Sequence, residues 1–207
     1  MKHYRQNNEG NGTFEINTRE KVLEVALELF ASRGFKGTSI RDIAKAMNMS
    51  ISNIYHYFGS KEGILVDLYK TSSERLINGL KEASLKDLPP LELYRLLLGA
   101  HVRFFEKYPN ESKLFAIDPA QLSPAILPSI REVRREVLLI YIGVLEKLQE
   151  VGALRTKNLR VLALNAFAVL NWPLRWYRAG GDLSMDEVCE EMISFIVNGS
   201  LVPGFPR

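Results

Sequence analysis

The sequence contains very little cysteine and histidine. It has one cysteine, Cys189, and three widely separated histidines, His3, His56 and His101, in 207 residues. A lone cysteine cannot form an intramolecular disulfide, and histidines this far apart lack the close spacing typical of a metal site. We therefore expect no disulfide, no bound metal and no other cofactor.

Long hydrophobic runs are also absent. The longest, Val161–Leu170, is interrupted by Asn165 and is shorter than the roughly 18 apolar residues needed to cross a bilayer. The N-terminal stretch MKHYRQNNEGNGTFEIN has no apolar segment that would serve as a signal peptide. We expect a soluble, cytoplasmic protein that does not bind a membrane.

The sequence lacks the common catalytic motifs. H-E-x-x-H, G-x-S-x-G and P-loop spacings are all missing, and no histidine lies near Cys189 in the sequence. An all-helical enzyme remains an alternative, but it would need carboxylates that no motif singles out. We expect a protein that is not an enzyme.

The small excess of positive charge is confined to one segment. The formal net charge is +3, and residues 1–61 alone carry nine Lys and Arg against six Asp and Glu. Between Arg33 and Lys61 five basic residues face one acid, Asp42. A basic segment beside a neutral one indicates a module that binds a polyanion, although a solvated basic surface would have the same composition.

Helical periodicity extends through most of the chain, and no segment shows the sustained alternation of a β-strand. Residues 1–16 are polar and aperiodic, so we expect a mobile tail there. The sequence predicts an all-α fold of about nine helices, with a helix-turn-helix domain over residues 17–62 and a helical bundle over residues 63–207. The expected helices are 17–33, two short helices within 38–58, 61–80, 91–108, 112–117, 129–150, 158–178 and 184–198.

The two short helices are joined by only about four residues, Met47–Ser50, and helices joined so tightly must cross steeply. Asn48 occupies a turn position that needs a left-handed backbone, which asparagine tolerates better than most residues. With Ile51, Ile54 and Phe58 packed inward, the second short helix would present polar side chains to a DNA major groove. These outward residues are Ser50, Ser52, Asn53, Tyr55 and His56.

The segment TSIRDIAKAMNMSISNIYHYFGSKEGIL resembles the DNA-binding domain of the TetR family of bacterial transcription regulators. The resemblance rests on Ile43-Ala44, on Tyr55–Phe58 and on Ser60–Glu62, and it covers about a quarter of the chain. It implies that one set of residues holds phosphates and another reads bases. The phosphate set is Thr38, Tyr55, His56 and Lys61, with Ser39 at a helix start, and the base-reading set is Ser50, Ser52 and Asn53.

The same resemblance implies a homodimer and a ligand pocket in the remaining helices. We expect two apolar stripes to form the dimer interface, although they would serve equally well to close the core of one subunit. The stripes are Leu159, Leu162, Ala166, Phe167 and Leu170, and Val188, Met192, Phe195 and Ile196. The candidate pocket residues are Tyr94, His101, Phe104, Phe105, Tyr141, Trp172, Trp176 and Tyr177, with a kink at Pro173 beside the two tryptophans.

The sequence therefore favours a dimeric repressor that binds a palindromic, double-stranded DNA operator. A small-molecule effector would release it by moving the helix that begins at Lys61 and so changing the spacing of the two reading helices. An adaptor dimer that has lost DNA binding is the other alternative.

Overall fold

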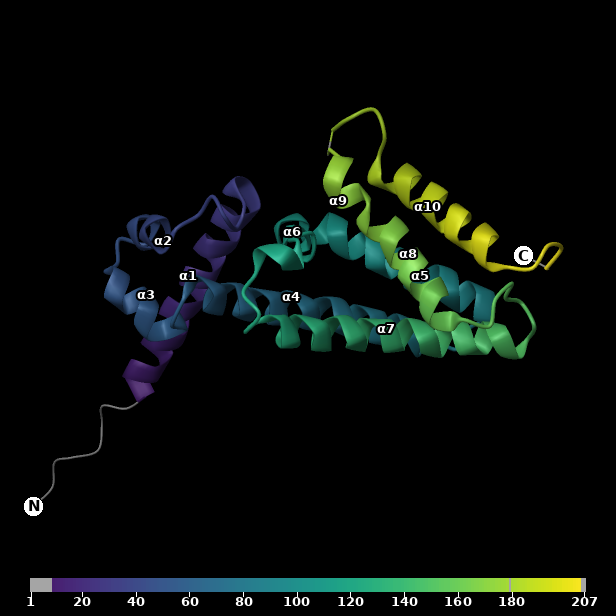
Figure 1. The fold of residues 1–207 in the computed structure, drawn as a ribbon, viewed down its shortest axis with the longest axis horizontal. Coiled ribbons are helices and arrows are strands. Elements are labelled where there is room, and N and C mark those ends of the chain that lie inside the picture. The colour runs from purple at the N-terminus through teal and green to yellow at the C-terminus, as the bar shows by residue number, and fades with distance from the viewer. Residues whose placement is uncertain (1–8, 179, 206–207) are drawn as a thin grey trace, which may run out of the picture.

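The computed structural model describes residues 9–178 and 180–205, and every regular element in this part of the chain is helical. Figure 1 shows α1, α2 and α3 grouped at one end of an elongated molecule, with α4 leading from them along α7. The elements are α1 Glu9–Arg33, α2 Ile40–Ala46, α3 Ile51–Phe58, α4 Lys61–Ser84, α5 Pro90–Lys107, α6 Pro109–Phe115, the 3-10 turn η1 Pro119–Gln121, α7 Leu127–Glu150, α8 Leu159–Asn171, α9 Pro173–Trp176 and α10 Met185–Ser200. The expected all-α architecture is confirmed.

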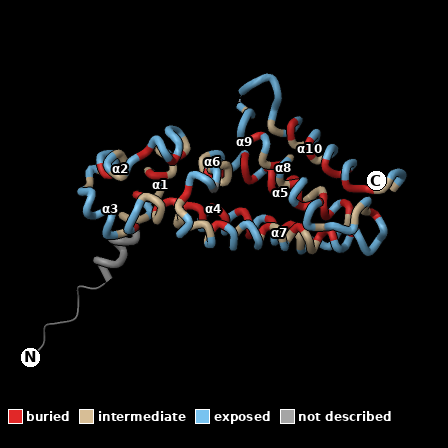
Figure 2. Tube along the Cα trace, viewed as in Figure 1, coloured by how far each residue is buried: buried red, intermediate tan, exposed pale blue. Residues whose placement is uncertain are grey.

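The buried side chains fall into two cores (Figure 2). The N-terminal core joins α1, α2 and α3 to the first half of α4. It also includes Leu114 of α6, Ile130 of α7, and Leu122 from the segment between these two helices. The C-terminal core lies among α5, α7, α8, α10 and the second half of α4. Because α4 contributes Leu65 to one core and Leu80 to the other, a single helix connects the two units.

Several helix boundaries differ from those predicted: α4 ends at Ser84 rather than at residue 80, α6 spans Pro109–Phe115 rather than 112–117, and α7 begins at Leu127 rather than at residue 129. Two further differences are larger. Helix α1 begins at Glu9, so residues 9–16 of the expected tail are helical, and residues 1–8 lie outside the described residues. No proline interrupts this segment, so the helix already extends through Asn17, where we expected it to begin. The predicted helix 158–178 is divided at Trp172 into α8 and α9, because Pro173 has no amide hydrogen to continue the helix.

The C-terminal end of the chain is held against the turn between α7 and α8. Leu201 forms an isolated antiparallel bridge with Leu154, and the Val202 amide donates to the Ala153 carbonyl at 2.8 Å. The Arg155 side chain donates to the Leu201 carbonyl at 2.6 Å. These bonds fix the end of α10 beside α7 and α8.

Candidate DNA-binding surface and effector core

Helix α3 is held by a left-handed turn, a side-chain cap and two buried anchors. Asn48 has φ 50°, as its place in the turn predicts, and the Ser50 hydroxyl accepts the Asn53 amide at 3.2 Å. Ile54 and Phe58 are buried against α1, α2 and α4. Helices α2 and α3 thus form the predicted helix-turn-helix.

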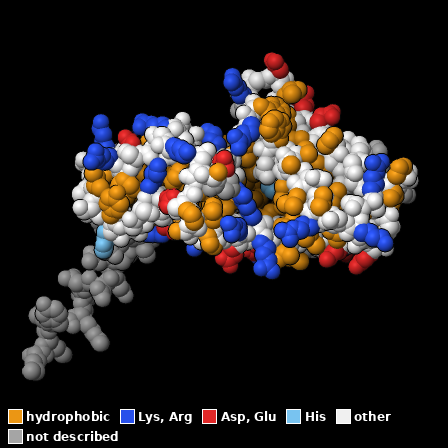
Figure 3. All heavy atoms as spheres, in the orientation of Figure 1, with side chains coloured by type: hydrophobic (Ala, Val, Ile, Leu, Met, Phe, Trp, Pro, Cys, Tyr) orange, Lys and Arg blue, Asp and Glu red, His pale blue; other side chains and the backbone are white. Residues whose placement is uncertain are grey.

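The outer face of α3 carries polar side chains. Ser52, Asn53 and His56 are exposed, and Tyr55 is 50% exposed. Ile51, which we expected to face inward, is 39% exposed because it occupies the first turn of α3, away from the core that Ile54 fills. In Figure 3 this end of the molecule shows hydrophobic atoms flanked by Lys and Arg side chains. The face combines groups that bond to base edges with groups that reach phosphates.

Ser39 begins α2 with a capping box. Its hydroxyl accepts the Asp42 amide at 3.2 Å, and its own amide donates to the Asp42 carboxylate at 2.8 Å. The Ser39 hydroxyl also donates to the Asp42 carboxylate, and the hydrogen bonds from the Ser39 hydroxyl and amide lower the pKa of that carboxyl group. Ser39 remains exposed, so it lies at the surface where the resemblance placed a phosphate contact.

Thr38 and Lys61 use their polar groups inside the protein. The Thr38 hydroxyl donates to the Gly34 carbonyl at 3.0 Å, and Thr38 is only 2% exposed. The Lys61 ammonium donates to the carbonyls of Phe35, at 2.9 Å, and Thr38, at 3.1 Å. It also lies 4.1 Å from the centre of the Phe35 ring. We therefore revise the expectation that the Thr38 side chain holds a phosphate. Lys61 fixes the α1–α2 turn to α4 in this conformation, and its contact with a phosphate through the third ammonium proton stays a prediction.

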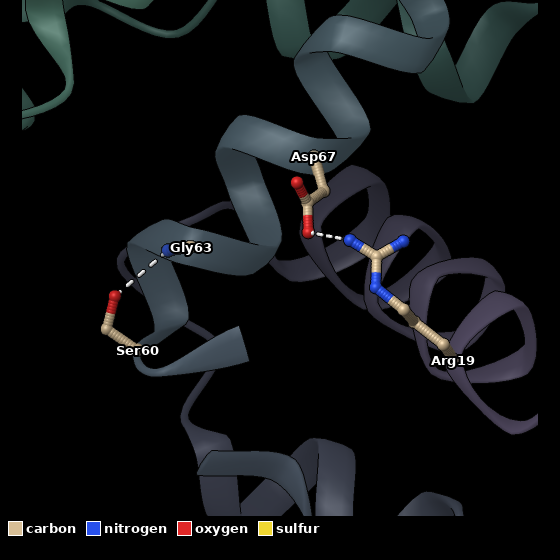
Figure 4. Close-up of polar contacts among 4 residues, drawn as sticks. All are labelled: Arg19, Ser60, Gly63 and Asp67. Carbon is tan, nitrogen blue, oxygen red and sulfur yellow. Dashed lines mark hydrogen bonds and ion pairs between the residues drawn. The ribbon is translucent and has the colours of Figure 1, made fainter. Parts of the chain in front are cut away.

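The start of α4 is capped by Ser60 and joined to α1 by an ion pair, as Figure 4 shows. The Ser60 hydroxyl accepts the Gly63 amide at 2.9 Å, and Arg19 of α1 forms an ion pair with Asp67 of α4. A Cβ atom on Gly63 would lie 2.0 Å from the Phe58 carbonyl oxygen, so only glycine fits there. Our sequence reasoning missed Gly63, whose requirement depends on the close approach of α3 to α4.

The C-terminal core contains the predicted aromatic and polar cluster. The His101 Nδ1 lies 2.8 Å from the Tyr141 hydroxyl, and both residues are buried. Phe105 contacts the His101 ring edge to face, with ring centres 5.1 Å apart, and Phe104 is buried beside Phe105. Burial lowers the pKa of His101 to about 4, so its ring is neutral near pH 7.

Trp172 and Trp176 do not belong to this core. They are 64% and 44% exposed, because the break at Pro173 turns α9 away from the bundle. Together with Ala168, Val169, Pro173 and Met192 they line an open, apolar hollow of about 300 Å³. Pro173 itself is buried, so the two tryptophans flank the expected kink but line an open hollow rather than an enclosed pocket.

Most of the residues expected at the dimer interface fill the core of their own subunit. Leu162, Ala166, Leu170, Val188, Met192 and Ile196 are buried, Leu159 and Phe167 are half-buried against them, and only Phe195 is exposed, at 69%. The exposed apolar face includes Phe195 of α10, but its other residues are not those of the predicted stripes. They are Val161, Leu164 and Ala168 on α8 and Trp172, which directly follows α8.

Within residues 9–178 and 180–205, no helix is long and apolar enough to cross a membrane. In the same part of the chain, no cluster of His, Cys, Asp or Glu side chains is arranged to hold a metal ion.

The chain matches two family models. Residues 22–68 match the model of bacterial regulatory proteins of the tetR family, and residues 87–200 match the tetracyclin repressor-like C-terminal domain. The second match alone covers more than half of the chain. The two matches correspond to the helix-turn-helix end and to the helical bundle described above.

Relatives and solved structures agree with these matches. The HTH-type transcriptional repressor KstR2 of Rhodococcus jostii is 28% identical over 194 residues, which cover 89% of this chain and 92% of the relative. The TetR-family regulator PfmR of Thermus thermophilus is 29% identical, with a TM-score of 0.75 over 86% of this chain and 97% of PfmR. AibR, solved in complex with isovaleryl coenzyme A and operator DNA, shares the fold at 19% identity and a TM-score of 0.78, covering 86% of this chain and 97% of AibR. The chain belongs to the TetR family of bacterial regulatory proteins.

Proposed function

We propose that this regulator represses transcription as a homodimer whose two α3 helices read a palindromic operator. The observation that carries the proposal is the exposed polar face of α3 on an intact helix-turn-helix. Asn53 and Ser52 lie near the N-terminal end of α3, the part that meets base edges when such a helix enters the major groove. KstR2, which is named a repressor, supports the sign of the regulation.

Affinity for the DNA backbone would come from groups around this face. Tyr55 and His56 are exposed beside the base-reading residues, and Ser39 lies at the surface start of α2. The Ser50 hydroxyl caps α3 and still has a proton with which to bond a base or phosphate. These contacts to phosphate position the helix without reading sequence.

The second copy of the chain would cover the exposed apolar face of α8 and α10. Met192 of α10 and Trp172, which follows α8, border the same hollow, and Phe195 is one turn from Met192. A surface tryptophan and phenylalanine beside an apolar hollow are typical anchors of a protein interface. A two-fold dimer formed here would present two α3 helices to one duplex.

The effector would act through α4 and α6, which contact both ends of the molecule. Glu62 of α4 accepts two hydrogen bonds from Ser123, at 2.9 and 2.7 Å. Lys113 of α6 donates to the Ala31 carbonyl of α1 at 3.2 Å. A change in the C-terminal core would therefore shift α3 through these contacts, and we propose that it separates the paired reading helices in the cytoplasm of a bacterial cell. The AibR complex supports a small molecule as the effector.

Fluorescence anisotropy with duplex DNA tests this function. We expect affinity to fall steeply with added salt, because each phosphate contact releases counterions. Tyr55→Ala should weaken binding to every sequence, whereas Asn53→Ala should mainly reduce the preference for the operator over random DNA. Lys157→Ala, an exposed charge near the start of α8, is the matched control.

Absence of salt-dependent binding to any duplex would contradict the proposal and favour an adaptor dimer. Equal losses for Asn53→Ala on operator and random DNA would contradict the base-reading role of α3.

A further inference from the structure

The C-terminal core contains a buried hydroxyl without a partner. Tyr94 of α5 is 0% exposed, and its hydroxyl has no hydrogen-bond partner among the residues that the structure describes. Burial raises the pKa of Tyr94 to about 12, and the nearby Ser200 hydroxyl of α10 lowers it in part. Ser200 donates its own proton to the Ile196 carbonyl at 2.6 Å, so it has no proton left to donate to Tyr94. An unpaired buried hydroxyl is costly, and folded proteins rarely retain one without a use.

A second polar pair lies in the same core. The hydroxyl of Tyr141 is bonded to His101, and Tyr94 is near enough to raise the pKa of Tyr141 further by charge repulsion. Phe105 and Phe167 surround His101 with ring centres 5.1 and 6.0 Å away. The core therefore combines an apolar enclosure with a small number of hydrogen-bonding groups, the composition of a ligand site.

The side chains of this core disfavour a buried anion beside Tyr94. Among the residues that the structure describes, the buried polar side chains include no lysine or arginine, and His101 is neutral near pH 7. A carboxylate beside Tyr94 would thus be buried without a counterion, which is strongly unfavourable. An uncharged oxygen would lose far less hydration on entering the core.

The surface hollow borders the same core that contains Tyr94. Met192 lines the hollow and also packs in the core that contains Tyr94, and its flexible side chain can move aside at low cost. Met192 and Ser200, which lies next to Tyr94, are eight residues apart on α10, a distance of about 12 Å along the helix axis. A ten-carbon chain spans that distance.

We propose that the effector is an uncharged, mainly apolar carbonyl compound, and that the Tyr94 hydroxyl donates a hydrogen bond to its carbonyl oxygen. This inference rests on the proposed function and specifies the ligand class of the same regulator. Tyr94 is the anchor for the oxygen, and the rings around His101 enclose the apolar body.

The test compares 2-decanone with decanoate, two ten-carbon probes that differ in the charge of their oxygen group. Binding to the full-length protein is measured by thermal shift and by calorimetry, and release from operator DNA is measured separately. We expect 2-decanone to raise the melting temperature and to weaken operator binding, and decanoate to have at most a small effect at the same concentration.

Tyr94→Phe removes only the hydroxyl oxygen. We expect this variant to bind 2-decanone about fivefold to tenfold more weakly, the usual effect of one lost hydrogen bond. Without ligand its melting temperature should equal or exceed that of the original protein, because an unpaired group has been deleted. Tyr108→Phe, a half-buried tyrosine at the end of α5, is the matched control and should change neither quantity.

Two results would overturn the inference. One is decanoate binding as tightly as 2-decanone. The other is a Tyr94→Phe variant that is less stable but binds 2-decanone unchanged, since the hydroxyl would then have only a structural role. If either result is found while the original protein still binds its operator, the ligand inference fails and the proposed function stands. If the original protein binds 2-decanone but no operator, the proposed function fails instead.

Discussion

Lys61 illustrates how a side chain predicted to hold a phosphate can also have partners within its own subunit that the sequence does not reveal. It lies in a basic segment at a helix start, where a phosphate contact is reasonable. In the structure its ammonium bonds the carbonyls of Phe35 and Thr38, and partial burial lowers its pKa. The spacing of residues along the sequence does not reveal that the α1–α2 turn folds back over this position.

Lys61→Met should lower the free energy of unfolding by about 1–3 kcal/mol, because two carbonyls lose a charged donor. Urea denaturation measures this loss. Lys36→Met removes the same charge from an exposed neighbour and should change stability by less than about 0.5 kcal/mol. Equal stabilities for the two variants would show that the Lys61 contacts contribute nothing.

His101 makes a second prediction at the scale of single residues. Its pKa is lowered from 6.5 to about 4 by burial, so the unfolded chain binds the proton more readily than the folded chain. The stabilising contribution is complete above about pH 6.5 and is lost as the pH falls towards 4. Between pH 7.5 and pH 5 the loss should be about 2 kcal/mol.

Urea denaturation of the original protein and of His101→Gln at both pH values measures this contribution. The fall in stability from pH 7.5 to pH 5 should be smaller by about 2 kcal/mol in the variant, while other groups titrate equally in both proteins. An identical pH dependence would show that His101 is not buried in its neutral form.

At the scale of elements, sequence patterns predicted the helix-turn-helix well and the surroundings of α8 less well. Ile54 and Phe58 repeat at helical spacing, and the Ser50 cap and Asn48 turn are encoded locally, so α3 lies where expected. The apolar residues of α8 extend over two faces, and periodicity alone does not say which face meets the core of its own subunit. The requirement for Gly63 and the exposure of Trp172 likewise depend on packing between distant elements.

The turn between α2 and α3 gives a direct test of its backbone. Asn48→Ala should destabilise the protein by about 1 kcal/mol, because alanine tolerates the left-handed conformation poorly. Asn48→Gly should stay within about 0.5 kcal/mol of the original protein, since glycine adopts that conformation freely. Thermal unfolding measures both, and equal losses would contradict the left-handed turn.

At the scale of the whole molecule, two cores are joined by α4, and one apolar face is left uncovered. The N-terminal core takes Leu114 and Ile130 from the C-terminal part of the chain, so the two units are not independent. The predicted domain boundary near residue 62 is therefore not a boundary between the two cores, because α4 contributes residues to both. This sharing gives a ligand in one core a physical route to the other.

Phe195→Glu should weaken the dimer at least tenfold, because it places a charge on the exposed apolar face of α8 and α10. Analytical ultracentrifugation over a range of protein concentrations measures the effect. Leu139→Glu alters another exposed leucine, 54% exposed on α7, and should leave the dimer intact. Loss of the dimer in Leu139→Glu but not in Phe195→Glu would locate the interface elsewhere.

Nuclease protection of the DNA flanking this protein's own gene tests the central claim most directly. A homodimer that reads DNA through two α3 helices should protect a palindrome whose half-sites are centred about 10 base pairs, or a multiple of one helical turn, apart. Asn53→Ala should lose that protection before it loses binding to random DNA. A protected site without two-fold symmetry would contradict reading by two α3 helices. Binding to DNA without protection of any particular site would contradict it as well.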